Sequence, residues 1–233
     1  MSEETWETDL KKAAAEVGAV VEGIFTVLRD GAEDAARLWS RIADDTGTVR
    51  TVDLAALRTP IEARLESHRY FDGTGLVVDP SALRDAERYQ EWWRPSVAGG
   101  YEFLDVNIGF GEEPYDYTGM SWFVGAARGL DSVRGPYVDL SGSDLYVLTF
   151  AVPAKVNDTF IGVSGADITV ANFESLVIGE LSALDSEVVV VNSADRVVIS
   201  SSPDYFPGER MRAAGNRDTH IGGPGVNWRV HRV

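Results

Sequence analysis

The chain has 233 residues, of which 44% are hydrophobic and 25% are charged, which is enough for one buried core or for one domain with a small lobe. Its 37 acidic and 21 basic residues give a formal net charge of −16, and such an acidic surface disfavours nucleic acid and anionic membrane surfaces as partners. The chain has no cysteine, so disulfides, thiolate metal sites and a cysteine nucleophile are excluded.

The first residues, MSEETWETDLKK, show no basic segment followed by an apolar run, so no signal peptide is expected. No later stretch approaches the roughly 20 apolar residues that a membrane helix needs. If residue 1 is the natural start, we expect a cytoplasmic protein. The alternative is an excised domain of an extracytoplasmic protein.

A long helix is predicted from about Thr5 to Ala43, with Thr5 as its N-cap and a bend near Asp30-Gly31. Apolar or small residues recur there in alternating steps of four and three, the heptad spacing of a buried seam. The seam consists of Leu10, Ala14, Val17, Val21, Ile24, Leu28, Gly31, Ala35, Leu38 and Ile42. Either the protein's own sheet or a second copy in a homodimer buries this seam, and the sequence leaves both alternatives open.

The following segment mixes helices with short strands. The predicted elements are a second helix from Leu54 to about Ser67, a buried strand in GTGLVVDP (73–80), a short helix from Ala82 to Trp93, a strand from Tyr101 to Asn107 and a helical segment within Tyr115–Arg128 that begins near Tyr117. Trp92 and Trp93 are accordingly interpreted as a packing patch at the end of a helix.

Short alternating runs joined by tight turns follow and predict an antiparallel meander. Its strands are 136–140, 144–155 and 159–170; after them come a helix from Phe173 to about Leu184 with Asn172 as N-cap, a hairpin formed by 187–192 and 196–202, a loop-rich tail and a final strand over 227–233. This order predicts an α+β fold. We expect two helices in residues 1–70, a sheet core in 71–184 and a small C-terminal lobe in 185–233.

Three segments carry a family pattern: YDYTGMSWFVGAA (115–127), GPYVDLSGSDLYVLTFAVPAK (135–155) and FIGVSGADIT (160–169). They resemble the ligand-binding sheet of Cache domains, the PAS-like (PDC) extracytoplasmic sensors of bacterial chemoreceptors and histidine kinases. The resemblance covers about residues 70 to 170. It implies a PAS-like antiparallel sheet, a long first helix and a small-molecule sensor. The segment 188–203 resembles the start of a second Cache module, which would be incomplete because about 30 residues follow it.

The resemblance also implies a ligand-binding set. The matching positions are Tyr115, Met120, Trp122, Phe123, Tyr137 and Asp167. Members of the family that bind amino acids carry at the position of Met120 an arginine that grips the ligand carboxylate, and a thioether cannot form that bidentate pair. They usually carry tyrosine at the position of Phe123. The half of the set that faces the ligand amine is retained, so this chain should not bind a generic α-amino acid in the usual way.

The same residues have a physical interpretation of their own. Aromatic faces around one carboxylate, Asp167, suit a small organic cation through cation–π attraction and a charged hydrogen bond. Trp122 and Phe123 are equally well explained as core residues, and Asp139 and Asp116 as turn or cap residues. Arg128 or Arg134 could supply the missing cation and restore carboxylate binding.

The residue pattern favours a sensor over an enzyme. The three histidines lie far apart and lack metal-ligand spacing, Gly162-Val163-Ser164-Gly165 is no nucleophile elbow, and Gly73-Thr74-Gly75 is a weak match to a dinucleotide loop. We therefore expect no catalytic residues, metal or cofactor, and a ligand that is a small amine or amino-acid-like metabolite. Signalling would then pass through a separate partner protein. The alternatives are a protein-interaction module without a ligand, a small-carboxylate sensor and an unfamiliar hydrolase.

Overall fold

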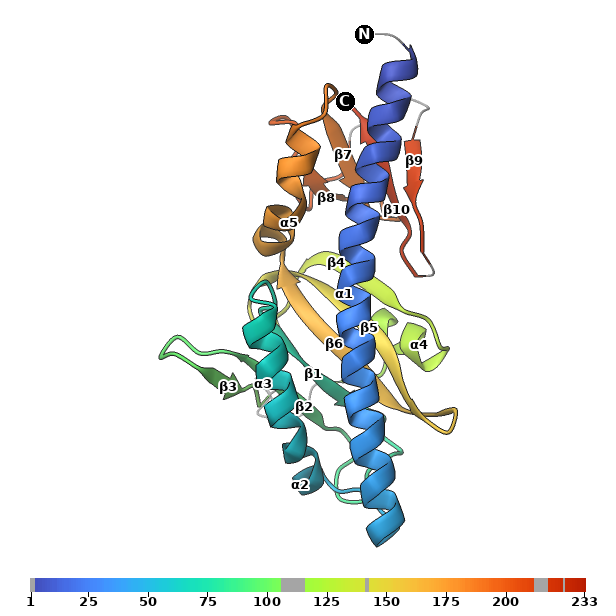
Figure 1. Cartoon of the computed structure of the whole chain (residues 1–233), viewed down its shortest axis with the longest axis vertical. Helices are drawn as coiled ribbons and strands as arrows, with labels where there is room; N and C mark the ends of the chain where they lie inside the picture. The colour runs from blue at the N-terminus through green and yellow to red at the C-terminus, as the bar shows by residue number, and fades with distance from the viewer. Residues whose placement is uncertain (1–2, 106–115, 141–142, 212–217, 224) are drawn as a thin grey trace.

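The computed structural model describes residues 3–105, 116–140, 143–211, 218–223 and 225–233, and it shows two antiparallel sheets placed along one long helix (Figure 1). The larger sheet has six strands and the smaller has four. The predicted α+β class, with a long first helix and antiparallel sheets, is confirmed.

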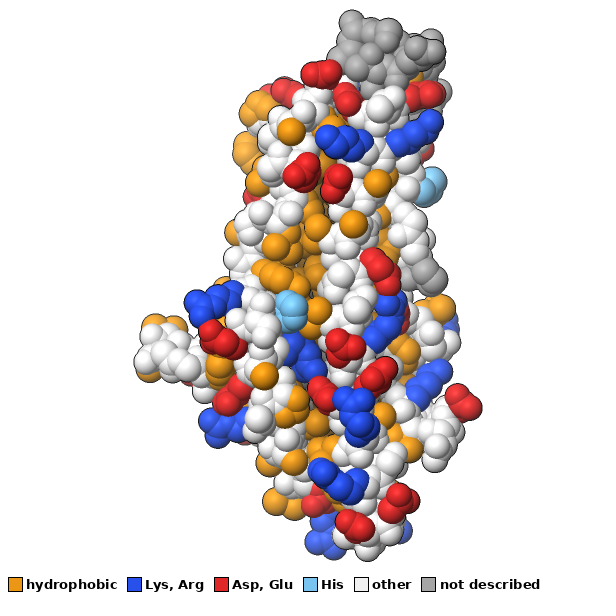
Figure 2. Space-filling model, in the orientation of Figure 1, with side chains coloured by type: hydrophobic (Ala, Val, Ile, Leu, Met, Phe, Trp, Pro, Cys, Tyr) orange, Lys and Arg blue, Asp and Glu red, His pale blue; other side chains and the backbone are white. Residues whose placement is uncertain are grey.

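Helix α1 (Glu3–Thr46) runs for 44 residues without interruption and contacts both sheets, β5 and β6 of the larger and β9 and β10 of the smaller. It begins before Thr5, so Thr5 is not its N-cap, and it continues through Asp30-Gly31. The eight apolar seam residues from Leu10 to Leu38 each expose 8% or less of their surface. The chain's own core buries these residues. Figure 2 shows the face that carries α1, where hydrophobic side chains remain visible in a band between the helices.

Three short helical segments follow α1 and lead into the larger sheet. They are α2 (Thr51–Leu54), a 3-10 turn η1 (Ala55–Leu57) and α3 (Arg58–Ser67), and together they correspond to the predicted second helix. Helix α3 packs beside α1 on the same face of the sheet, where Ile61 and Leu65 are buried in the common core (Figure 1).

The larger sheet has the strand order β3-β2-β1-β6-β5-β4. The strands are β1 (Gly73–Val78), β2 (Gln90–Pro95), β3 (Tyr101–Phe103), β4 (Ser132–Val138), β5 (Tyr146–Val156) and β6 (Thr159–Thr169). The predicted meander is therefore confirmed as β4-β5-β6. Strand β1 lies at the centre of the sheet, between β2 and β6, and β3 lies at the edge opposite β4.

The predicted helix from Ala82 to Trp93 is wrong, because residues 90–95 form strand β2. Glu91 and Trp93 face α1 and α3, while Gln90 and Trp92 face the other side of the sheet. Pairing with β1 fixes residues 90–95 as a strand and so determines which side chain faces which side. The local composition favours a helix and does not indicate this pairing. Trp92 and Trp93 therefore lie on opposite faces and form no common patch.

The smaller sheet has the order β8-β7-β10-β9, so the predicted hairpin is part of a four-stranded sheet. Its strands are β7 (Val188–Val191), β8 (Val197–Ser200), β9 (Asp218–Ile221) and β10 (Trp228–Arg232). Helix α5 (Val170–Ser182) precedes it, and its N-cap is Thr169, whose hydroxyl accepts from the Asn172 amide at 3.2 Å. Asn172 was predicted as the cap, but its side chain donates to Asp72 instead.

Each face of the larger sheet has its own apolar core. The face toward α1 and α3 belongs to the large core that continues into the smaller sheet. The opposite face carries helix α4 (Ser121–Ala127) and a separate cluster of Val77, Trp92, Tyr117, Trp122, Phe123, Ala126, Ala151 and Val163. A cavity lies on this second face.

Candidate ligand-binding site

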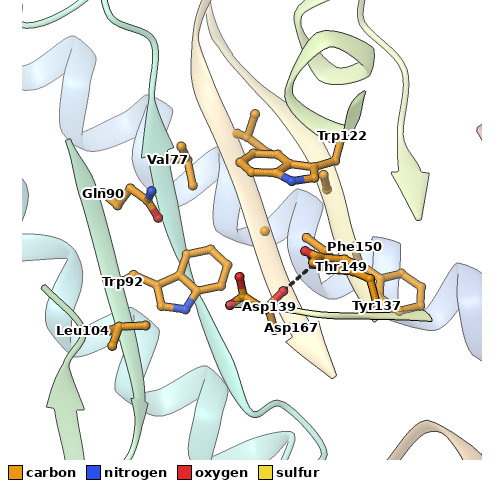
Figure 3. A pocket seen from close by; sticks show the side chains of 13 residues that line it. Val77, Gln90, Trp92, Leu104, Trp122, Tyr137, Asp139, Thr149, Phe150 and Asp167 are labelled. Carbon is orange, nitrogen blue, oxygen red and sulfur yellow. Dashed lines mark hydrogen bonds between the residues drawn. The ribbon is translucent and has the colours of Figure 1, made fainter. Parts of the chain in front are cut away.

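The cavity lies between the larger sheet and α4 and has a volume of about 40 Å³ (Figure 3). Its lining comes from all six strands of the larger sheet or their ends and from α4: Val77, Gln90, Trp92, Leu104, Trp122, Tyr137, Asp139, Thr149, Phe150, Ala151, Val163, Gly165 and Asp167. A volume of about 10–15 Å³ holds one water, so the cavity accepts a headgroup such as an ammonium and little more.

Gly165 in β6 helps to keep this space open. A methyl group at its position would stand 3.2 Å from the Phe150 carbonyl oxygen and 3.4 Å from the Trp92 ring. A side chain here would therefore crowd the Phe150 carbonyl oxygen, touch the indole and take up room in the cavity. The glycine-rich pattern of β6 thus has a direct structural reason at this position.

Asp167 is the polar centre of the cavity. The Thr149 hydroxyl donates to its Oδ1 at 2.6 Å, and the Tyr137 hydroxyl lies 2.6 Å from the same Thr149 oxygen. Burial raises the pKa of Asp167 to about 7; the Thr149 hydrogen bond opposes the rise, while the charges of Asp139 and Asp72 add to it. In the described part of the chain, no basic side chain forms an ion pair with Asp167.

Two indole rings contribute the aromatic part of the lining. Figure 3 shows Trp92 from β2 and Trp122 from α4 around the same space as the carboxyl groups of Asp139 and Asp167. Trp122 exposes 8% of its surface and stacks on Tyr117, whose hydroxyl donates to the Val78 carbonyl at 2.7 Å. These contacts hold the Trp122 ring against the cavity. A cation at Asp167 would therefore lie near aromatic faces.

The structure brings three of the six sequence-predicted ligand residues, Trp122, Tyr137 and Asp167, into the cavity lining. Phe123 does not line it; its ring packs on Tyr117 at 5.2 Å and on Phe160 at 5.6 Å. Met120 is 39% exposed and lines an adjoining groove rather than the cavity. Tyr115 lies outside the described residues.

The two aspartates interpreted as turn residues differ from each other. Asp116 accepts from the Thr118 amide at 3.0 Å and is a turn residue that pairs with Arg88. Asp139 also serves a turn, accepting from the Ser143 amide at 2.9 Å, but it lines the cavity as well. The site therefore holds two carboxyl groups.

Ten of the thirteen lining residues were not predicted as ligand residues from the sequence, and Trp92 and Thr149 are two of them. Thr149 is paired with Asp167 across β5 and β6, and Trp92 is paired with Gly75 across β2 and β1. The alternation in DLYVLTFAV could have indicated that Thr149 shares a face with Val147 and Ala151, but only the register places it beside Asp167.

Residues 57–175, just over half of the chain, match the family described as methyl-accepting chemotaxis protein-like, first PDC sensor domain. The chain is also 25% identical over 174 residues to the methyl-accepting chemotaxis protein PscA of Pseudomonas syringae pv. tomato. That match covers 71% of this chain and 27% of the receptor, so the chain spans about a quarter of the length of that relative.

Two solved sensor domains have the same fold. One is the ligand-binding domain of the Pseudomonas aeruginosa PAO1 amino acid chemoreceptor PctB in complex with L-Arg (TM-score 0.58, 15% identity, 99% of this chain and 93% of that one). The other is the ligand-binding domain of the Pseudomonas fluorescens chemoreceptor CtaA in complex with L-valine (TM-score 0.57, 16% identity, 96% and 92%). Among the residues that the structure describes, no helix is both long enough and apolar enough to cross a membrane.

Proposed function

Since the chain belongs to the family of first PDC sensor domains of methyl-accepting chemotaxis protein-like receptors, we propose that it binds a small amine or amino-acid-like metabolite in the cavity beside Asp167. The observation that carries this proposal is the Asp167 carboxyl group, which has one hydroxyl donor and no basic partner in the described chain, next to two indole rings. A ligand ammonium would supply the missing donor and positive charge.

The size and charge of the cavity favour a cation over an anion. With Asp139 and Asp167 both in its lining, an anionic headgroup would meet two carboxyl groups. An interaction module without a ligand should have a closed core beside Asp167. The cavity beside Asp167 is therefore evidence against that alternative. The amino acids bound by the PctB and CtaA domains support a ligand that carries an ammonium group.

The domain plan remains part of the proposal. Residues 71–184 would form the sensing core, residues 1–70 would support it, and residues 185–233 would form a small second module. Ligand occupancy would be read by a separate signalling partner, with no reaction catalysed. The receptor family supports the extracytoplasmic alternative for the location of the domain.

The test is a thermal-shift screen of amines, amino acids and short carboxylates, followed by calorimetry with the best amine. A ligand that binds the native state alone raises the melting temperature. Asp167→Asn keeps the shape and removes the charge, and it should weaken amine binding by about 2–5 kcal/mol. Asp158→Asn is the matched control, because Asp158 is exposed in the turn between β5 and β6 and loses the same charge.

Undiminished amine binding by Asp167→Asn would contradict the site. A screen in which carboxylates bind and amines do not would contradict the charge argument. An equal loss in Asp158→Asn and Asp167→Asn would show that overall charge, and not the cavity, determines affinity.

A further inference from the structure

A larger hollow adjoins the cavity on the side of β4. This groove has a volume of about 420 Å³ and shares Trp122, Tyr137 and Asp139 with the cavity. The groove is within the size range of small-molecule sites, whereas the cavity's 40 Å³ holds a headgroup alone. A ligand with its cationic end at Asp167 therefore has room to extend into the groove.

A row of three polar side chains leads from the cavity to the groove. Arg134 of β4 pairs with Thr149 of β5, and Thr149 pairs with Asp167 of β6. Directly paired residues in antiparallel strands point to the same face, so all three share the face that carries α4. Two strand spacings separate the backbones of Arg134 and Asp167 by about 10 Å.

The two ends of this row carry opposite charges that do not meet. The Arg134 Nε donates to the Ser121 hydroxyl, and within the described residues Arg134 forms no ion pair. Arg196 lines the same groove, and its Nη1 donates to the Gly208 carbonyl at 2.8 Å. The groove thus offers a guanidinium to an anion, and the cavity offers a carboxylate to a cation.

The wall of the groove between these charges is partly apolar. Met120, Val138 and Leu140 line it and are 39%, 49% and 72% exposed. A chain of methylene groups lying along them would be removed from water on binding. An α-amino acid carries both charges on one carbon and cannot place them at both ends of the row.

We propose that the ligand of this site is an ω-amino acid, a zwitterion with several carbons between its charges, whose ammonium lies in the cavity at Asp167 and whose carboxylate lies in the groove at Arg134. This proposal rests on the proposed function and deepens it by naming the ligand class. It makes Arg134 the specificity-determining residue for the anionic end, while Asp167 binds the cationic end.

Calorimetry at pH 8 with matched ligands tests the assignment on the whole chain. The panel is 5-aminopentanoate, pentylamine, L-norvaline and 1,5-diaminopentane, which share the chain length and differ in the second charge or its position. We expect 5-aminopentanoate to bind at least tenfold more tightly than each of the others. Arg134→Gln should remove that advantage while leaving the dissociation constant of pentylamine within twofold, and Arg134→Lys should restore part of it.

Arg128→Gln is the control, because Arg128 is exposed at the end of α4, lies outside the groove and removes the same charge. It should leave all four affinities unchanged. If no amine binds at all, the proposed function fails as well. If pentylamine binds but norvaline or the diamine equals or exceeds 5-aminopentanoate, or if Arg134→Gln weakens pentylamine equally, the ω-amino acid assignment alone is overturned.

Discussion

The two faces of the larger sheet hold carboxyl groups in different ways. On the face toward α1 and α3, Glu91 accepts from the Trp93 indole at 2.7 Å with one oxygen and from the Tyr89 hydroxyl at 2.7 Å with the other. On the opposite face, Asp167 accepts from Thr149 with Oδ1, and no described residue donates to its Oδ2. A carboxyl group satisfied by its own chain stabilises the fold, whereas a partly satisfied one leaves a place for a ligand.

The same contrast holds for positive charge. Arg64 of α3 pairs with Asp34 of α1 at 2.8 Å and is 10% exposed, so that guanidinium is committed to joining two helices. Arg134 on the other face has a hydroxyl as its partner. Substitutions on the helix face should therefore change stability, and substitutions on the cavity face should change binding and its pH dependence.

The largest expected effect is the pH dependence that Asp167 adds to stability. Its pKa is about 7 in the folded protein and near 3.8 in the unfolded chain, so the folded state holds the extra proton between these values. This contribution is present in full below pH 3.8 and is lost as pH rises through 7. The loss amounts to up to about 4 kcal/mol. Unfolding in urea from pH 4 to pH 8 should show a steeper decline for the wild type than for Asp167→Asn.

Subtracting the two profiles removes every titration that the two proteins share, including that of Glu91, whose pKa burial also raises. If the unfolding free energies of the wild type and Asp167→Asn change with pH in parallel, folding does not raise the pKa of Asp167. The same ionisation predicts that amine affinity rises with pH up to about 8, because the carboxylate form binds the cation.

Removing the satisfied carboxyl group on the helix face should have the next largest effect. Glu91→Ala leaves the buried Trp93 indole and the Tyr89 hydroxyl without their acceptor, which costs about 3 kcal/mol of unfolding free energy. Glu102→Ala is the control, because its exposed ion pair with Arg94 contributes about 0–1 kcal/mol. Urea unfolding measures both. A small loss in Glu91→Ala would contradict the view that this face is purely structural.

Two glycines of α1 give a smaller effect with opposite signs. A methyl group at Gly31 would stand 2.7 Å from the Ser164 hydroxyl and 3.0 Å from the Arg64 guanidinium carbon, so Gly31→Ala should lower stability by about 1 kcal/mol after its gain in helix propensity. Gly23 has no atom within 4 Å of such a methyl group, and Gly23→Ala should raise stability by up to about 1 kcal/mol. Thermal unfolding of both variants decides whether α1 packs this closely on the sheet.

The smallest effect concerns the hydroxyl that bonds Asp167. Thr149→Val removes a hydrogen bond that lowers the pKa of Asp167, so the pH at which amine binding sets in should move upward. The accompanying loss of stability should be about 1 kcal/mol. Thr159→Val is the control, since Thr159 is exposed at the start of β6. Calorimetry of amine binding across pH measures this shift. If the midpoint pH of amine binding is unchanged in Thr149→Val, Thr149 does not act on Asp167 in the site.

The sequence allowed prediction of the elements that rest on local pattern. The seam of α1 and the alternation of β4-β5-β6 are visible in single segments, and both were found. Strand β2 was missed because its conformation depends on pairing with β1 and β3. Strand β9 was missed because it is a short, mostly polar edge strand within a stretch rich in glycine.

The site could be predicted in part for the same reason. Trp122, Tyr137 and Asp167 follow from motif order, whereas Trp92 and Thr149 depend on register between distant strands. The position of Arg134 depends on the irregularity in β4 between Arg134 and Tyr137, which turns both residues to the α4 face. No single segment carries that information.

The long first helix also determines the order in which tertiary contacts can form during synthesis. Residues of α1 leave the ribosome before the strands that cover its seam, because these strands lie between Gly73 and Arg232. Gly18, for example, packs near Ile221. Contacts across such sequence separations form slowly, because a long loop must close before they are made. Until β9 and β10 are synthesised, the N-terminal half of α1 exposes its seam to other nascent chains and to chaperones.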